Sequence, residues 1–230
     1  MNDSNIAYTV AVWLIPLVIA IVFHEVAHGW VARALGDETA ARLGRLTLNP
    51  IRHVDPVGTV GLPLVLAVAG APIFGWAKPV PVVAANMRHP RRDMVLVALA
   101  GPGSNFVLAL VTALALGAVF AAGGGALPKA GVAGFLTANL VNFLLINVFL
   151  GVFNLIPLPP FDGGHVVEGA LPRGALPAWH QLARFAFPIM LVLLVVLPML
   201  APEWNVVGQA VTPIVRAVIG TLVGIAGLSV

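Results

Sequence analysis

The feature that most constrains this chain is a set of long stretches with almost no charge. Spanning the roughly 30 Å hydrocarbon core of a bilayer takes about 20 apolar residues in a helix. Stretches of that kind cover residues 6–31, 94–121, 133–158 and 182–201, and a weaker one covers 206–230. Charged residues make up 9% of the chain, against about 25% in soluble domains. We therefore predict an all-α polytopic membrane protein with about five to six membrane segments.

One further apolar stretch, 57–77, does not fit a single crossing. Prolines and glycines interrupt it, and basic loops precede and follow it. Because positively charged loops stay in the cytoplasm, both of its ends are expected on the cytoplasmic side. We therefore predict a re-entrant element or a short hairpin that lines a protein cavity. Short β-strands are expected beside it at 42–48 and 80–83, where prolines restrict the second to a sheet edge.

The motif H-E-V-A-H occupies residues 24–28, and its glutamate is the one charged residue of the stretch 6–31. Residues four apart on a helix share a face, so His24 and His28 can bind one metal ion. Glu25 can then serve as the general base for a water molecule. The alternative is that both histidines bond only to neighbouring backbone and that Glu25 pairs with one of them. Ionisable groups are costly in hydrocarbon, and this favours the functional interpretation.

Catalytic zinc sites usually take three protein ligands, and the predicted topology indicates the third. If the first stretch runs towards the cytoplasm and the second runs outward, the third returns to the side of the two histidines. Asp162 follows this third stretch, between prolines that end the helix and glycines that allow a tight turn. We therefore predict Asp162 as the third ligand. Two alternatives stay open: Asp162 caps a helix over 163–170, or His165 or Glu168 takes the ligand position.

Polar residues also interrupt the second and third stretches. Gly101-Pro102-Gly103-Ser104-Asn105 indicates either a helix break with a close-packing surface for the histidine helix, or plain packing of small residues. In the third stretch we expect two asparagines, Asn142 and Asn147, to form interhelical hydrogen bonds. The absence of cysteine excludes disulfides and thiolate ligands. No basic run is interleaved with aromatic residues, so the chain is not expected to bind nucleic acid.

Three motifs together resemble the site-2 proteases, the intramembrane zinc metalloproteases of peptidase family M50. They are H-E-V-A-H in the first span, A-G-P-G-S-N at 100–105 and N-L-I-P-L-P-P-F-D-G-G at 154–164, supported by F-G-W-A-K-P-V-P-V at 74–82. The resemblance covers roughly residues 10–170. It implies one Zn²⁺ per chain held by His24, His28 and Asp162, with Glu25 as the catalytic glutamate and Asn154 near the reacting carbonyl.

The same resemblance implies hydrolysis of peptide bonds in or near the transmembrane segments of membrane-protein substrates. An unwound substrate segment is expected to add to the predicted strands at 42–48 or 80–83. We expect a short family form without a PDZ or nucleotide-sensing domain: a single domain over 1–230, with a catalytic core over about 6–170 and C-terminal membrane segments over 180–230. It is expected in the cytoplasmic membrane of a prokaryotic cell, with its active site towards the cytoplasm.

Two other classes of protein are alternatives. A different membrane zinc hydrolase would take its third ligand from a downstream glutamate, for which Glu168 is the sole plausible residue. A non-catalytic zinc-binding scaffold or a transporter would need no general base, and a transporter would need polar residues along a path. The intact Glu25 and the nearly apolar remaining spans favour a protease over both.

Overall fold

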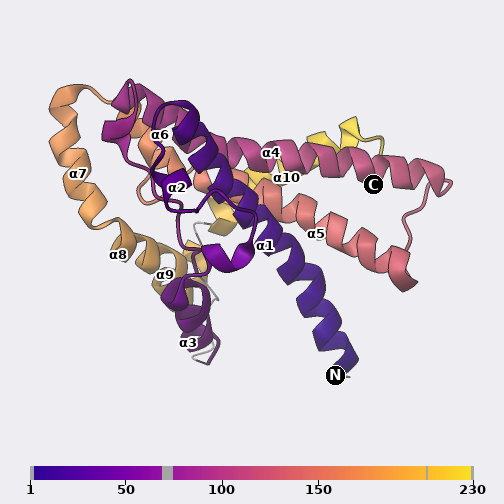
Figure 1. Cartoon of the computed structure of the whole chain (residues 1–230). Helices are drawn as coiled ribbons and strands as arrows, with labels where there is room; N and C mark the ends of the chain where they lie inside the picture. The colour runs from indigo at the N-terminus through magenta and orange to yellow at the C-terminus, as the bar shows by residue number, and fades with distance from the viewer. Residues whose placement is uncertain (1–2, 69–74, 206, 229–230) are drawn as a thin grey trace.

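The computed structural model describes residues 3–68, 75–205 and 207–228, and they fold into a mainly helical protein (Figure 1). Four helices are long and apolar enough to cross a membrane: Ile6–Ala34, Pro90–Ala122, Gly131–Asn154 and Gly208–Ile225. A fifth crossing is formed only if the pair Arg173–Arg184 and Ala186–Leu200, bent by 58°, counts as one span. The described residues therefore hold four or five candidate spans. The predicted all-α membrane architecture is confirmed, whereas the predicted five to six segments are not.

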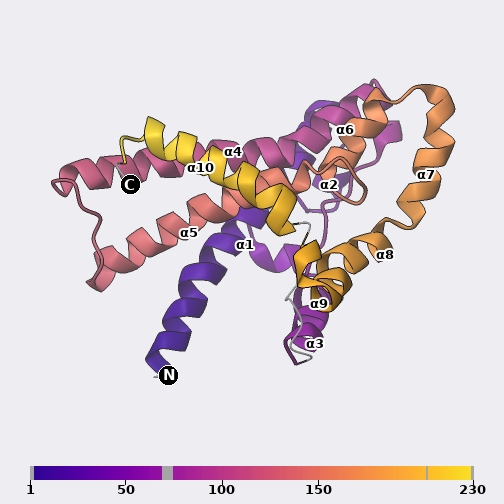
Figure 2. The same ribbon diagram turned by 180° about the vertical axis from the view of Figure 1, so that it is seen from behind.

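The long helices pack around α4 (Pro90–Ala122), which contacts α1 (Asp3–Ala34), α5 (Gly131–Asn154) and α6 (Asp162–Ala170). Helix α10 (Thr212–Ile225) lies against α4 and α5 on the side turned to the viewer in Figure 2. Small residues of α4 make these close approaches possible, because Ala109 and Ala113 are fully buried. A Cβ at Gly117 would stand 2.2 Å from a backbone oxygen of the segment after α10, which is the packing that membrane helices favour.

The remaining helical segments are short. Between α1 and α4 lie α2 (Thr39–Arg42), η1 (Pro50–His53), η2 (Pro56–Gly61), α3 (Leu62–Val68) and η3 (Ala84–Asn86). After α6 come η4 (Arg173–Ala175), α7 (Leu176–Arg184), α8 (Ala186–Leu191), η5 (Val192–Val196), α9 (Leu197–Leu200), η6 (Pro202–Trp204) and η7 (Val207–Val211). Helices α7 to α9 form an arm that stands away from α4 and α5 in both ribbon views.

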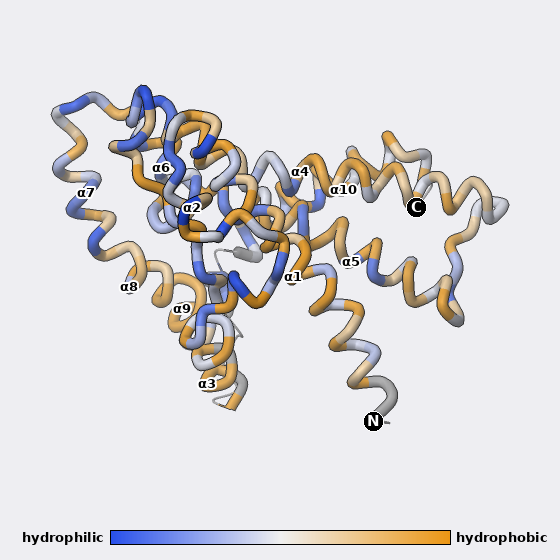
Figure 3. Tube along the Cα trace, in the orientation of Figure 1, coloured by the Kyte–Doolittle hydropathy of each residue, from blue (hydrophilic) through white to orange (hydrophobic). Residues whose placement is uncertain are grey.

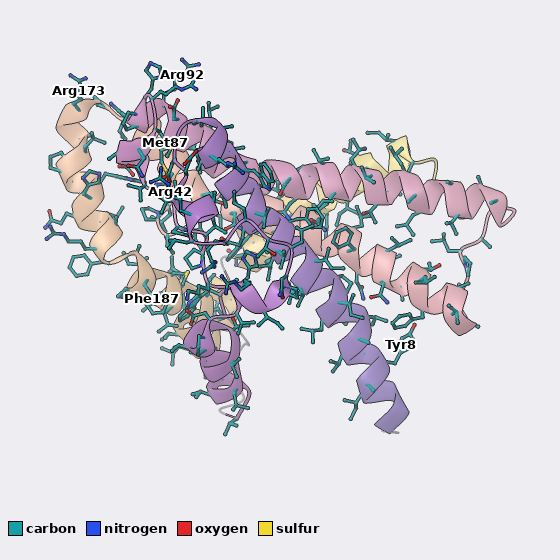
Figure 4. All side chains as sticks on the ribbon, in the orientation of Figure 1. Tyr8, Arg42, Met87, Arg92, Arg173 and Phe187 are labelled. Carbon is teal, nitrogen blue, oxygen red and sulfur yellow. The ribbon has the colours of Figure 1, made fainter. Side chains whose placement is uncertain are left out.

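Hydropathy divides the molecule into two regions. Hydrophilic residues gather around α2, α6 and α7, whereas α1, α4, α5 and α10 are mainly hydrophobic (Figure 3). The labelled Arg92 and Arg173 lie at that hydrophilic end, and Tyr8 lies at the opposite end of the molecule (Figure 4). Large apolar side chains such as Trp13 and Val107 are exposed along the long helices. A surface of this kind matches lipid contact better than contact with water.

Proline inside a membrane helix removes a backbone donor, and the fold supplies a substitute. Pro16 of α1 cannot donate to the carbonyl of Val12, which lies four residues earlier. Asn142 of α5 donates its Nδ2 to that carbonyl at 2.7 Å. This bond confirms an interhelical role for Asn142 and fixes α1 against α5.

The predicted break in the second span is wrong. Helix α4 runs without interruption from Pro90 to Ala122 with Pro102 inside it. Ser104 donates its hydroxyl to the carbonyl of Gly101 at 2.7 Å, so the backbone near the proline is still bonded. The glycines in this group therefore permit close packing within a continuous helix.

The predicted β-strands at 42–48 and 80–83 are also wrong, because the described residues contain no strand. Prolines at 79 and 81 offer no backbone donor, and the N–H groups of Val80 and Val83 donate to carboxylates of Glu25 and Asp37, at 2.8 Å and 2.6 Å. Within 80–83 this leaves only the N–H of Val82 for a ladder. In the 42–48 segment, turn and helix-end bonds replace strand pairing, such as that of the Arg45 N–H to the carbonyl of Ala40.

The two ends of the apolar stretch 57–77 lie side by side and are joined by hydrogen bonds. The N–H of Trp76 donates to the carbonyl of Gly58 at 3.1 Å, and the hydroxyl of Thr59 donates to the carbonyl of Trp76 at 2.9 Å. A single crossing would separate the two ends by the thickness of the bilayer, so 57–77 is not a single span. Its residues 69–74 lie outside the described part of the chain. The ring of Trp76 also contacts Phe187 of α8, with centroids 5.3 Å apart.

Candidate metal centre

Three side chains from two distant parts of the chain converge on one point in the bundle. His24 and His28 come from α1, and Asp162 is the first residue of α6. The two histidine Nε2 atoms are 3.1 Å apart, and Asp162 Oδ2 lies 3.2 Å from His24 Nε2 and 3.4 Å from His28 Nε2. These three residues form the group in the described part of the chain that can hold a metal ion.

The helix period places the histidines on one face of α1, and neighbouring helices bury them there. His24 is 7% exposed and His28 is 9% exposed. Gly29 follows directly, and a Cβ there would stand 2.3 Å from Leu46 and 2.8 Å from Val80. Glycine at residue 29 therefore lets the side chains of Leu46 and Val80 lie directly against α1 beside the histidines.

Each histidine is oriented by a hydrogen bond at its other ring nitrogen. His28 Nδ1 lies 2.7 Å from the carbonyl oxygen of Val97, which can only accept, so His28 donates there. His24 Nδ1 lies 2.7 Å from Asn105 Oδ1. In the neutral imidazole the second nitrogen then carries a lone pair. Both Nε2 lone pairs consequently face the centre, as metal-binding histidines require.

A buried chain of asparagines fixes the direction of the His24 bond. Asn147 donates Nδ2 to the carbonyl of Phe143, and Asn105 donates Nδ2 to Asn147 Oδ1, both at 2.8 Å. The Phe143 carbonyl can only accept, so the Asn147 amide turns its Nδ2 towards that carbonyl and its Oδ1 towards Asn105. The Asn105 amide must then turn its Nδ2 towards Asn147 and its Oδ1 towards His24. Asn105 Oδ1 is therefore the acceptor for His24. Both asparagines are fully buried, and the expected interhelical role of Asn147 is confirmed.

Helix α4 approaches the two imidazole rings through Gly101. A Cβ at this position would stand 2.4 Å from His28 Nε2 and 2.6 Å from His24 Cε1. Ordinary contact begins at 3.4 Å, so even a methyl group does not fit. The close-packing surface for the histidine helix that was predicted for the 101–105 group is confirmed, whereas the helix break predicted with it is wrong.

Glu25 lies between the histidines and is held by a loop. Its Oε2 accepts the N–H of Val80 at 2.8 Å. The bond from Val80 does not occupy the other carboxylate oxygen, which can accept a proton. The alternative in which Glu25 pairs with one of the histidines is not what the structure shows, since Asp162 occupies that position.

Two glycines bring Asp162 to the histidines. A Cβ at Gly163 would stand 2.4 Å from the carbonyl oxygens of Leu155 and Ile156, and one at Gly164 would stand 2.8 Å from the nitrogen of Pro159. Helix α6 can start directly against the proline-rich turn only without those side chains. The topology argument that α5 returns to the histidine side is thereby confirmed.

The helix-cap alternative for Asp162 is wrong. Phe161 is the N-cap of α6, and no side-chain cap bond forms. Asp162 Oδ2 is buried and has no hydrogen-bond partner. A buried carboxylate oxygen without a donor, opposite two imidazole lone pairs, fits a site for a cation.

The donor set fits zinc. Tetrahedral ligands held about 2.0–2.1 Å from zinc lie about 3.3–3.4 Å from one another. The three separations here, 3.1 Å, 3.2 Å and 3.4 Å, match a triangular face of such a tetrahedron. Two imidazoles and one carboxylate leave the fourth position open, which is the pattern of catalytic sites.

Three other predicted site residues do not join this cluster. Asn154 is the last residue of α5, and its Nδ2 donates to the carbonyl of Leu150 in the same helix at 3.0 Å. Glu168 pairs with His180 of α7 at 2.8 Å and with His165 at 3.6 Å. His165 and Glu168 therefore belong to a partly exposed group on α6 and α7, and neither replaces Asp162.

Sequence reasoning missed the acceptors behind the histidines, Asn105 and the carbonyl of Val97. Asn105 was placed in a packing motif and not assigned to His24. The sequence does contain a signal for this role of Asn105, because a lone amide in an apolar helix needs a polar partner. The carbonyl of Val97 carries no signal in its side chain, since any residue type offers one.

Apolar helices around a buried His₂–Asp centre, with a glutamate between the histidines, define a membrane-embedded H-E-x-x-H metal-site protein. The family described as "Peptidase family M50" matches residues 12–197, and the chain belongs to this family. Its membership agrees with the resemblance to site-2 proteases drawn from the motifs.

Curated relatives carry the same assignment in their names. The candidate zinc metalloprotease YwhC of Bacillus subtilis is 40% identical over 184 residues, which cover 79% of each chain. The candidate zinc metalloprotease Rip2 is 32% identical in Mycolicibacterium smegmatis, over 81% of this chain and 66% of the relative. Rip2 of Mycobacterium tuberculosis is 35% identical over 85% of this chain and 68% of the relative. No solved structure matches the chain significantly.

Proposed function

We propose that this chain is an intramembrane zinc metalloprotease that hydrolyses peptide bonds in or near transmembrane segments of membrane-protein substrates. The observation that carries the proposal is the buried triangle of two imidazole nitrogens and one carboxylate oxygen, beside a glutamate on the same helix turn. Family membership and the zinc metalloprotease names of the relatives support it.

In this proposal His24, His28 and Asp162 hold one Zn²⁺. When bound there, zinc supplies Lewis acidity, which polarises a peptide carbonyl and lowers the pKa of a water molecule towards about 7. The chain's own groups prepare the ligands: Asn105 and the Val97 carbonyl keep both Nε2 lone pairs directed at the centre. Close packing by Gly101 keeps the rings from moving away.

Glu25 is the proposed general base. The Val80 N–H holds its Oε2, so the carboxylate is fixed while its other oxygen accepts a proton from water. Glu25 then returns the proton to the leaving amine. Structural zinc sites need no such group, which favours catalysis over a scaffold role.

Asn154 is proposed as a donor to the oxyanion that develops on the scissile carbonyl. Its Nδ2 donates to Leu150 of its own helix, so this role requires the side chain to turn when substrate binds. A substrate helix must also unwind before its carbonyl can react. The predicted binding of that segment to strands has no strand to use among the described residues.

We propose that the site faces the cytoplasm in the membrane of a prokaryotic cell. Basic residues of the loops before and after 57–77 lie at the end of α1 that carries the histidines, and positive charge favours the cytoplasmic side. The paired ends of 57–77 support a re-entrant element there. The whole chain 1–230 forms one domain in this proposal, with a core over about 6–170 and C-terminal membrane segments over 180–230.

The test is cleavage of a panel of single-span substrates by the purified full chain. Glu25→Gln is expected to retain stoichiometric zinc and lose at least about 100-fold in cleavage rate, whereas Asp162→Ala loses both zinc and cleavage. Glu38→Gln is the matched control, because Glu38 is an exposed glutamate paired only with Arg42. Cleavage by Glu25→Gln that persists in the presence of a chelator would refute the mechanism.

The same experiment separates the alternative classes. A non-catalytic zinc scaffold predicts bound zinc and no cleavage by the wild type. A different membrane zinc hydrolase with Glu168 as ligand predicts that Glu168→Gln loses zinc and that Asp162→Ala keeps it. The pairing of Glu168 with His180 on the surface argues against that arrangement.

A further inference from the structure

A cavity of about 530 Å³ lies along the segment that holds Glu25 and is lined by three cations. They are Arg45, Arg52 and Lys78, and five apolar residues complete the wall: Leu43, Ile51, Val54, Pro79 and Pro81. The two sides come from residues 43–54, which include η1, and from residues 78–81. No role in the proposed hydrolysis accounts for this concentration of positive charge.

Arg45 is the strongest indication that an anion belongs here. The residue is 8% exposed, and its Nη2 donates only to the backbone carbonyls of Lys78 and Pro79, at 2.9 Å and 3.3 Å. Its Nε is buried and has no hydrogen-bond partner. A guanidinium buried to this extent is normally paired with an anion.

No anion of the chain supplies that partner within the described residues. The ion pairs found there involve Arg42 and four histidines, and none involves Arg45, Arg52 or Lys78. The carboxylate nearest to Arg52 along the chain, that of Asp55, already accepts two backbone N–H groups at the start of η2. The three cations therefore face the cavity without compensation.

The rim of the cavity is apolar and uncovered. Ile51 is 77% exposed, Leu43 is 58% exposed and Val54 is 41% exposed. Exposed aliphatic side chains around a cluster of cations match an amphiphilic ligand, whose anionic group enters the cavity while its hydrocarbon lies on the rim. Arginine suits phosphate in particular, because its planar fork donates two parallel hydrogen bonds.

We propose that this cavity binds the phosphate headgroup of an anionic phospholipid. Clustered lysine and arginine near a membrane surface attract anionic lipids. Arg45 and Arg52 contact the phosphate, Lys78 adds charge, and acyl chains lie over Leu43 and Ile51.

The cavity wall is shared with the metal centre. Lys78, Pro79 and Pro81 flank Val80, whose N–H holds Glu25. An occupant of the cavity therefore lies against the segment that positions the proposed base. That connection rests on the proposed function, whereas lipid binding does not, and Glu25→Gln is expected to bind lipid as the wild type does.

The test is native mass spectrometry of the full chain in a nonionic detergent, titrated with phosphatidylglycerol or phosphatidylcholine. Removing one lipid-facing charge weakens binding by about fivefold, so the double variant Arg52→Gln/Lys78→Gln is expected to bind phosphatidylglycerol about 25-fold more weakly. The matched control is Arg33→Gln/Arg42→Gln, which removes the same charge outside the cavity and is expected to stay within twofold of the wild type. Arg45 is left intact because its backbone bonds support the fold.

Three results would overturn the proposal. They are equal binding of the two lipids, equal weakening in both double variants, and displacement of phosphatidylglycerol by an equal concentration of inorganic phosphate, which would indicate a free-anion site. A thermal readout guards against misfolding: phosphatidylglycerol should raise the unfolding temperature of the wild type and of the control more than that of Arg52→Gln/Lys78→Gln.

Discussion

Replacing Gly101 with alanine adds one methyl group to the surface of α4 that touches both histidines. That carbon would stand 2.4 Å from His28 Nε2 and 2.6 Å from His24 Cε1, whereas ordinary contact begins at 3.4 Å. Neither ring can turn aside freely, because each is buried and bonded at Nδ1 to α4 itself. Relief requires α1 and α4 to separate or the rings to leave their positions.

The size of the shift decides the consequence. Regaining ordinary contact takes a displacement of about 1 Å, while zinc–ligand distances tolerate about 0.2 Å. Gly101→Ala should therefore weaken zinc binding by at least about 10- to 100-fold, the loss typical of disturbed ligand orientation. Overpacking should also lower the free energy of unfolding by about 1–3 kcal/mol.

The assay is competition for zinc between the purified full chain and a chromophoric chelator, followed by denaturant unfolding in detergent. Gly103→Ala is the matched control, because it makes the same substitution two residues along α4 where a Cβ has nothing within 4 Å. Both variants gain the same helix propensity. The difference in zinc affinity and in unfolding free energy between the two variants therefore reports the contact of residue 101 with the histidines.

If Gly101→Ala binds zinc as tightly as Gly103→Ala, the close approach of α4 does not shape the metal centre. An unfolding free energy of Gly101→Ala equal to that of Gly103→Ala would likewise show that the rings relax at no cost. Either result would refute the argument that α4 holds the ligands in place.

Three further predictions concern buried polar groups. Asn105→Ala removes the acceptor of His24 and should weaken zinc binding by about 10- to 100-fold in the same titration. Asn142→Ala removes a buried bond to the backbone of α1 and should lower the free energy of unfolding by about 1–3 kcal/mol without changing zinc affinity. Burial raises the pKa of Asp37, but hydrogen bonds, that of the Asn86 amide first among them, lower it below its ordinary value of 3.8. A lowered pKa stabilises the fold only while the group is ionised, so Asp37→Asn should be less stable than the wild type at pH 7, and the difference should shrink as the pH falls below 3.8. Equal stability of the two proteins at pH 7 would contradict this.

Much of the centre could be predicted because its signals are local. The four-residue spacing of His24 and His28 places them on one helix face in any fold. Asp162 needed one more step, the alternation of span directions, and the structure brings it within 3.4 Å of both histidines. The span boundaries followed from the length of the apolar stretches, since only satisfied helices cross lipid.

The errors arose where a local pattern competes with distant partners. The segment 80–83 has the composition of an edge strand, but the N–H groups of Val80 and Val83 are taken by carboxylates of Glu25 and Asp37. Those partners lie 55 and 46 residues away, so no window around the segment contains them. Asp162 likewise has the sequence of a helix cap, yet its oxygen faces the histidines and not its own helix.

The sequence by itself determined that this is a membrane protein of the H-E-x-x-H type, which three side chains converge at the candidate metal centre, and on which side of the bundle they meet. The length of an apolar stretch and the helix period depend only on residues within a few turns of one another. They can therefore be interpreted without knowledge of the fold. Only the tertiary structure decided how the ligands are held: by Asn105, 81 residues from His24, by the Val97 carbonyl and by the missing side chain of Gly101. Buried polar groups must find partners wherever the packing brings them, and that choice is made by the whole fold.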